Sequence, residues 1–195
     1  MDQASYFRNH PPRCIAGFVA RPAELPGVTF DGHVSMSQLN VQALSGVVID
    51  APEHINPVFG LWCRCGGNRH FVHCYRWTNP DYNTDPITLS PIDLECATCT
   101  TITPLLDTDI HGYDPEIGAG SATRRAEGER AVFECLSCGR QPFQTFVRFE
   151  YSDDLFDRNY SEFAGREQEL FSWFSLVGKC PQCSQVLPIA DFECA

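Results

Sequence analysis

The sequence predicts a mainly β protein with two tandem copies of one structural unit, preceded by a short N-terminal β segment. Three observations support this prediction. Eight cysteines after residue 59 form four close pairs, and the second and fourth pairs are followed by matching residues. Short runs of strand-forming residues also alternate with turns marked by proline and glycine. At 195 residues, the chain suits one domain or two small ones.

The N-terminal segment, residues 1–58, contains a single cysteine, Cys14, and several prolines. Two short runs, 27–30 and 46–49, are rich in valine, isoleucine, threonine or phenylalanine and are bordered by turn residues. We therefore expect two or three strands in this segment, packed against the rest of the protein.

The internal repeat is clearest after the second and fourth cysteine pairs. Residues 96–107 read CATCTTITPLLD, and residues 180–191 read CPQCSQVLPIAD. Both fit the pattern C-x-x-C-x-x-x-x-P-[LI]-[LA]-D without a gap. In each copy the earlier pair, which ends at Cys65 or Cys138, is followed by glycine and then by an aromatic strand. The chain therefore contains two copies of one unit.

The copies are assigned to residues 59–117 and 131–195. Between them, residues 118–130 are rich in glycine, small residues and charge, as is typical of a flexible linker. In the second copy, the run 171–177 could be a helix, but the repeat favours a strand that leads into Cys180.

The compartment bears on what the cysteines do. The chain starts without a basic and apolar signal sequence, and it has no apolar stretch of about 20 residues. We therefore expect a cytoplasmic protein that does not span a membrane. Thiols stay reduced in the cytoplasm, so the 11 cysteines are better explained as metal ligands than as disulfides.

The cysteine spacing predicts metal sites. A C-x-x-C pair in a tight turn lets both thiolates reach one ion, and a following glycine allows the positive φ at which the backbone turns back. Gly139 stands at that position after the third pair. The sequence predicts one four-cysteine site in each copy. The first set is Cys63, Cys65, Cys96 and Cys99, and the second is Cys135, Cys138, Cys180 and Cys183.

The first set departs from the usual spacing. Only one residue separates Cys63 from Cys65. In an extended chain, residues i and i+2 face the same way, so both thiolates could still bind one ion. His70, His73 and Cys74 lie close by in the sequence and are alternative ligands for this site.

Two close cysteine pairs separated by a β-hairpin resemble the zinc-ribbon and rubredoxin-like group of folds, over roughly residues 60–106 and 131–191. The resemblance implies two tandem zinc-ribbon-like modules that bind two structural zinc ions per chain. Rubredoxins carry iron and usually have glycine after both pairs. Thr100 and Ser184 occupy the later positions here, which favours zinc. Four thiolates leave no open coordination position, so the resemblance implies a structural metal.

The charge guides the prediction of a partner. The formal net charge is −11, from 25 acidic and 14 basic residues. This excess disfavours binding to nucleic-acid phosphates, and it favours a basic protein partner or simply high solubility. We expect a non-enzymatic, zinc-stabilised module that binds a protein and neutralises or regulates it, as an immunity-type protein or an adaptor does.

The first alternative function is nucleic-acid or transcription-associated binding, on the precedent of zinc ribbons. A basic patch formed by Arg64, Arg69 and Arg76 would support it. The acidic net charge of the chain counts against it.

The second alternative is a hydrolase that uses the segment Asp107–Glu116. Carboxylates and a histidine, here Asp109, His111 and Asp114, can perform acid–base chemistry. The competing interpretation is a turn whose aspartates bond their own backbone. The sequence contains no nucleotide-binding or hydrolase motif that would favour an enzyme.

Overall fold

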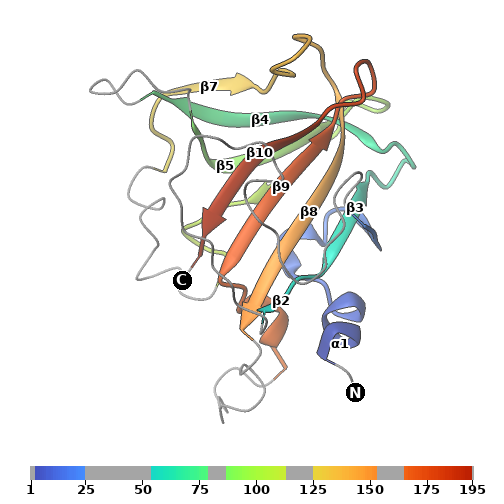
Figure 1. Cartoon of the computed structure of the whole chain (residues 1–195), viewed down its shortest axis with the longest axis vertical. Helices are drawn as coiled ribbons and strands as arrows, with labels where there is room; N and C mark the ends of the chain where they lie inside the picture. The colour runs from blue at the N-terminus through green and yellow to red at the C-terminus, as the bar shows by residue number, and fades with distance from the viewer. Residues whose placement is uncertain (1–2, 25–53, 79–86, 113–124, 153–164, 195) are drawn as a thin grey trace.

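The protein is mainly β, as predicted from the sequence. The computed structural model describes residues 3–24, 54–78, 87–112, 125–152 and 165–194. Within them, ten strands form one antiparallel sheet that curls on itself (Figure 1). No helix in these segments has the length and hydropathy needed to cross a membrane. The runs 27–30 and 46–49, predicted as strands, lie outside the described residues.

The first copy contributes β3 to β6, and the second contributes β7 to β10. The strands are β1 (Val19–Pro22), β2 (His54–Ile55), β3 (Val58–Trp62), β4 (Arg69–Trp77), β5 (Ile87–Cys96), β6 (Ile102–Leu106), β7 (Glu129–Val132), β8 (Phe143–Ser152), β9 (Trp173–Lys179) and β10 (Val186–Glu193). The helical elements are the α-helix α1 (Gln3–Asn9) and the 3-10 helices η1 (Arg13–Ile15) and η6 (Glu167–Glu169). Strand β9 confirms the strand interpretation of 171–177.

The two copies exchange strands within the sheet. Each forms its own ladder, β4-β5-β6 or β8-β9-β10, but β3 pairs with β8 and β7 pairs with β4. The two exchanged pairings have the same register. The repeat aligns Val58 with Arg130 and Tyr75 with Arg148. Val58 lies opposite Arg148 in one pairing, and their counterparts Arg130 and Tyr75 lie opposite each other in the second. The copies are therefore related by an approximate twofold axis and together form one continuous sheet.

The approximate axis passes between β4 and β8. His70 lies opposite Phe143, its counterpart in the repeat, and Arg69 lies opposite Gln144. His70 also lies opposite Cys96 on its other side. Strands β4 and β5 run across one end of the molecule, while β8, β9 and β10 run obliquely away from it (Figure 1). This geometry brings the cysteine turns of both copies to the same region of the sheet.

Most of the buried apolar side chains belong to one hydrophobic core. It contains aromatic residues of the second copy that the sequence singled out, among them Phe143, Phe149 and Phe174, all fully buried. Helix α1, which the sequence did not predict, adds Phe7, whose ring stacks on Tyr151 with centroids 3.8 Å apart. Complete burial of such a side chain contributes about 2–3 kcal/mol, so α1 is part of the core.

Candidate metal centres

Three of the four cysteine turns share one backbone geometry. The N–H of the residue after the second cysteine donates to the carbonyl of the first. These bonds are Thr100 to Cys96 (2.8 Å), Gly139 to Cys135 (2.7 Å) and Ser184 to Cys180 (2.9 Å). Each donor residue has φ between 58° and 66°. This left-handed conformation costs a residue other than glycine about 1 kcal/mol or more, so the turn imposes it even on threonine and serine.

The first turn is a shortened form of the other three. The N–H of Gly66 donates to the carbonyl of Cys63 (2.8 Å), and the N–H of Cys63 donates to the carbonyl of Gly67 (2.7 Å). A tight turn therefore brings Cys65 close to Cys63. The expectation that these cysteines would chelate from an extended chain was wrong, because the backbone reverses within the C-x-C segment.

The eight predicted cysteines meet in two groups, one for each predicted set. Within each group the sulfur atoms all lie within 4.8 Å of one another. Four Sγ–Sγ distances join the two turns of a group: Cys63–Cys99 is 3.5 Å, and Cys65–Cys96, Cys135–Cys183 and Cys138–Cys180 are each 3.6 Å.

These distances distinguish a metal site from a disulfide. A disulfide bond would bring two sulfurs to about 2.05 Å. Four thiolates arranged as a tetrahedron around zinc, each about 2.3 Å from the ion, would lie about 3.8 Å apart. The observed separations of 3.5 and 3.6 Å are close to the tetrahedral value. Each cluster is thus shaped to hold one metal ion.

The strands fix how deeply each thiol is buried. Cys96 ends β5, Cys180 directly follows β9, and both are fully buried. The later cysteine of each turn lies nearer the solvent, as Cys99 and Cys138 do. Each turn therefore contributes one buried thiol and one more exposed thiol to its cluster.

Hydrogen bonds stabilise some of these cysteines as thiolates. The hydroxyl and backbone N–H of Thr101 lower the pKa of Cys99 to about 6. Burial opposes ionisation of Cys180, but the backbone N–H groups of Cys183 and Gln182 still lower its pKa to about 7. By contrast, partial desolvation by the neighbouring groups of the cluster raises the pKa of Cys138 to about 12, as do hydrogen bonds with the other three thiols. Four adjacent thiolates repel one another, so full ionisation requires a cation.

The alternative ligands of the first site are engaged elsewhere. The ring of His73 places Nε2 2.9 Å from the Glu95 carboxylate, and the ring of His70 places Nδ1 2.8 Å from the Thr145 hydroxyl. Cys74 is fully buried in the hydrophobic core. Among the described residues, the first cluster consists of cysteines alone.

The described part of the segment Asp107–Glu116 forms a braced turn. Both carboxylate oxygens of Asp107 accept bonds from Arg125, at 2.7 and 2.5 Å, and Oδ1 also accepts the N–H of Asp109 at 3.1 Å. Arg125 holds the pKa of Asp107 below its usual range. Nδ1 of His111 accepts a hydrogen bond from the backbone N–H of Asp107, and burial lowers the pKa of His111. Asp114 and Glu116 lie outside the described residues.

The three arginines of the nucleic-acid hypothesis do not form one patch. Arg64 lies in the first cysteine turn and donates to the carbonyl of Ala16 (3.3 Å). Arg69 begins β4, whereas Arg76 lies near the other end of this strand, about 23 Å away at about 3.3 Å per residue. The guanidinium of Arg76 lies over the Phe133 ring, 5.1 Å from its centroid.

Sequence reasoning missed two contributors to these centres. Thr101 binds Cys99 through its hydroxyl, with sulfur and oxygen 3.3 Å apart. Gly67 provides space beside Cys96, because a Cβ at this position would lie 2.9 Å from the Cys96 sulfur. The consecutive glycines 66 and 67 after the C-x-C pair were the available signal for the second contributor.

Comparison of the chain with protein-family models, curated proteins and solved structures finds no match. The resemblance to zinc ribbons therefore rests on the two four-cysteine clusters and the hairpins that carry them. These features describe metal-binding geometry, and they leave the biological role to be argued from the charge and surface of the molecule.

Proposed function

We propose that each four-cysteine cluster binds one structural zinc ion. The observation that supports this most strongly is the near-tetrahedral spacing of the sulfurs, 3.5–3.6 Å in four pairs that each join two turns. Zinc suits such a sulfur cage because it has no redox chemistry and accepts tetrahedral geometry. Four protein ligands would close the coordination sphere, so the ion would have no position for a substrate.

The proposed ions would stabilise the fold. Each would join the turn of one hairpin, β5–β6 or β9–β10, to the turn between two strands that pair with other neighbours, β3 and β4 or β7 and β8. Structural zinc contributes about 10–16 kcal/mol of apparent binding energy in small zinc peptides at neutral pH. Because the copies share one sheet, the loss of either ion should also weaken the strand pairings of the other copy.

We further propose that the zinc-stabilised sheet is a non-enzymatic scaffold for binding a basic protein. The charge distribution supports this. The net charge is −11, and the stretch 150–162, which continues from β8, carries five acidic residues and one arginine. Acidic charge concentrated in a few segments favours association with a basic surface.

The partner-binding proposal can be tested with two charge-matched variants. The first neutralises four acids of the segment 153–162, through Asp153→Asn, Asp154→Asn, Asp157→Asn and Glu162→Gln. The control neutralises four exposed acids of the described segments, through Glu127→Gln, Glu129→Gln, Glu134→Gln and Glu193→Gln. Tagged proteins are used to capture partners from an extract of the source cells, and each captured protein is then purified and titrated by calorimetry.

The proposal predicts a Lys- and Arg-rich partner that binds the native chain and the control but loses affinity for the 153–162 variant. Equal affinity for all three proteins, or a partner without excess basic charge, would contradict it. Metal content is measured on every variant, so that loss of zinc is not mistaken for loss of an acidic contact.

A further inference from the structure

A pocket of about 220 Å³ lies beside the second cysteine cluster, where β4, β8 and β9 run next to one another. Its lining includes the side-chain donors Asn68, Arg69, Gln144, Lys179 and Ser184. None of its lining residues carries a carboxylate. In a chain with a net charge of −11, this is a local concentration of cationic and neutral donors.

The sheet register places the central donors in a row. Arg69 lies opposite Gln144 across β4 and β8, and Gln144 lies opposite Lys179 across β8 and β9. Directly opposed residues in an antiparallel sheet project from the same face, about 5 Å apart. The guanidinium and the ammonium groups therefore flank one amide on a rigid platform.

The two cations are uncompensated within the described segments. Elsewhere in the sheet, arginine side chains are paired with acids, as Arg130 is with Asp93 and Arg148 with Glu150. Neither Arg69 nor Lys179 makes a side-chain hydrogen bond or ion pair with another described residue. Two cations that flank one amide, with no carboxylate between them, repel each other, so an anion placed between them would be stabilised.

We propose that this pocket binds a single phosphate group, presented by a small molecule or by a phosphorylated side chain. A guanidinium offers two parallel N–H donors that match phosphate oxygens, and an ammonium adds a mobile charge. The volume is below the roughly 300–1,000 Å³ of pockets for drug-sized ligands, so it fits one anionic group. The net charge of −11 disfavours a nucleic-acid chain, which would bring many phosphates.

The same two cations have a competing role. A zinc ion with four thiolates carries a net charge of −2, and Lys179 immediately precedes Cys180. The cations could therefore balance the charge of the second metal centre without binding any ligand. The two roles differ in what is lost on substitution: ligand binding in one case, and zinc affinity in the other.

The test is an NMR titration of the full-length protein with inorganic phosphate, with O-phosphoserine and with a short single-stranded oligonucleotide, at constant ionic strength in chloride. We expect saturable shifts for the first two probes, confined to the amides of β4, β8 and β9 around Arg69, Gln144 and Lys179. Tighter binding of O-phosphoserine than of phosphate would identify a phosphorylated side chain as the source. Equal binding would identify the phosphate group alone.

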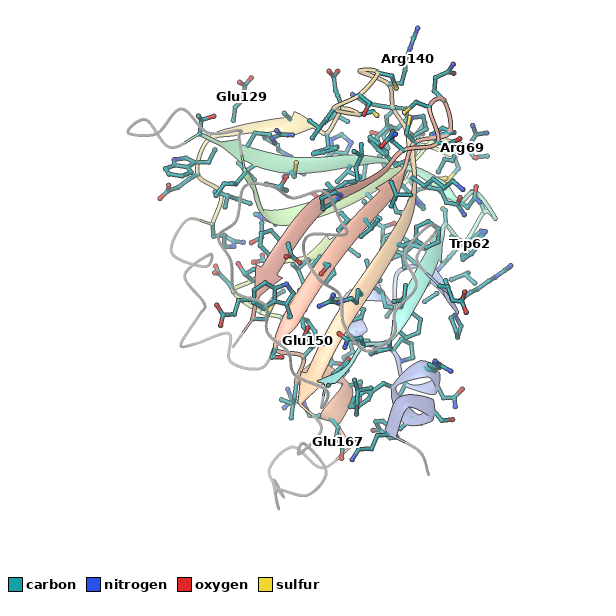
Figure 2. All side chains as sticks on the ribbon, in the orientation of Figure 1. Trp62, Arg69, Glu129, Arg140, Glu150 and Glu167 are labelled. Carbon is teal, nitrogen blue, oxygen red and sulfur yellow. The ribbon has the colours of Figure 1, made fainter. Side chains whose placement is uncertain are left out.

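Three variants complete the test. Arg69→Gln and Lys179→Gln should each weaken phosphate binding about tenfold or more, the size of a lost charge-assisted hydrogen bond. Arg140→Gln is the control, because Arg140 carries the same charge at the same end of the molecule but does not line the pocket (Figure 2). The remaining resonances report whether each variant keeps its fold.

Three results would overturn the proposal. The first is the absence of saturable shifts with phosphate and O-phosphoserine at millimolar concentrations. The second is binding of the oligonucleotide alone. The third is a loss of zinc in Lys179→Gln with no change in the response to phosphate, which would assign the cations to charge balance.

Discussion

Replacing Gly67 by alanine should damage the first metal centre selectively. The added Cβ would lie 2.9 Å from the Cys96 sulfur and 2.8 Å from the Thr98 hydroxyl oxygen. The hydroxyl can rotate away, but Cys96 is fully buried at the end of β5 and cannot move without leaving its cluster. The collision is thus transferred to a proposed zinc ligand.

The expected magnitude follows from the cost of overpacking. Adding a methyl group to a tightly packed site costs about 1–3 kcal/mol. Since about 1.4 kcal/mol corresponds to a tenfold change in affinity, zinc binding at the first cluster should weaken about 5- to 150-fold. The second cluster should keep its affinity, because the substitution touches none of its four cysteines.

Gly139→Ala is the matched control in the second copy. Gly139 has a φ of 66°, but a Cβ there would meet no atom within 4 Å. Thr100 and Ser184 already adopt this conformation with a side chain, so the control should cost only about 1 kcal/mol of backbone strain. Its effect on zinc affinity should therefore stay within about fivefold.

The assay is a zinc competition against a chelator of known affinity, with the two sites resolved by the cysteine ¹³Cβ chemical shifts. We expect Gly67→Ala to release zinc from the first cluster at a lower chelator concentration than the native protein. Unchanged affinity at both clusters would refute the packing argument. Equal weakening of both clusters would show that the substitution disrupts the shared sheet instead.

Three further predictions follow. Cys180→Ser should reduce bound zinc from two ions per chain to one, measured by elemental mass spectrometry; retention of both ions would remove this cysteine from the ligand set. Burial lowers the pKa of His70 from 6.5 to about 4, so protonation disfavours the folded state, and native stability should fall by about 3 kcal/mol as the pH drops through that window. His70→Phe, which introduces the residue found at the matching Phe143, should lack this fall in urea unfolding, and an identical pH dependence would refute the assignment. Phe7→Ala should cost about 3–5 kcal/mol in thermal or urea unfolding, whereas the exposed Arg8→Ala should change stability by about 0.5 kcal/mol or less; equal effects would show that α1 is not part of the core.

The sequence predicted the groups of cysteines well because their arrangement is mostly local. A C-x-x-C turn positions two sulfurs through bonds within six residues, as in the turn that begins at Cys135. The internal repeat then indicated which pairs belong together. The shorter turn at Cys63 was harder, because its conformation depends on the two glycines that follow.

The strand exchange could not be read from the sequence. Pairing of β3 with β8 and of β7 with β4 depends on register between distant segments, and no local pattern specifies it. β7 also begins at Glu129, inside the segment 118–130 predicted as a linker. The pocket was hidden for the same reason, because Arg69 and Lys179 meet only through their common neighbour Gln144.

The most direct test of two structural zinc centres is native mass spectrometry of the intact, tag-free protein, before and after treatment with a strong chelator and alongside circular dichroism. We predict a mass that corresponds to the reduced chain with two zinc ions, and loss of the β fold once both ions are removed. A folded chain without metal, or a mass lowered by the hydrogens lost in disulfide formation, would contradict the account.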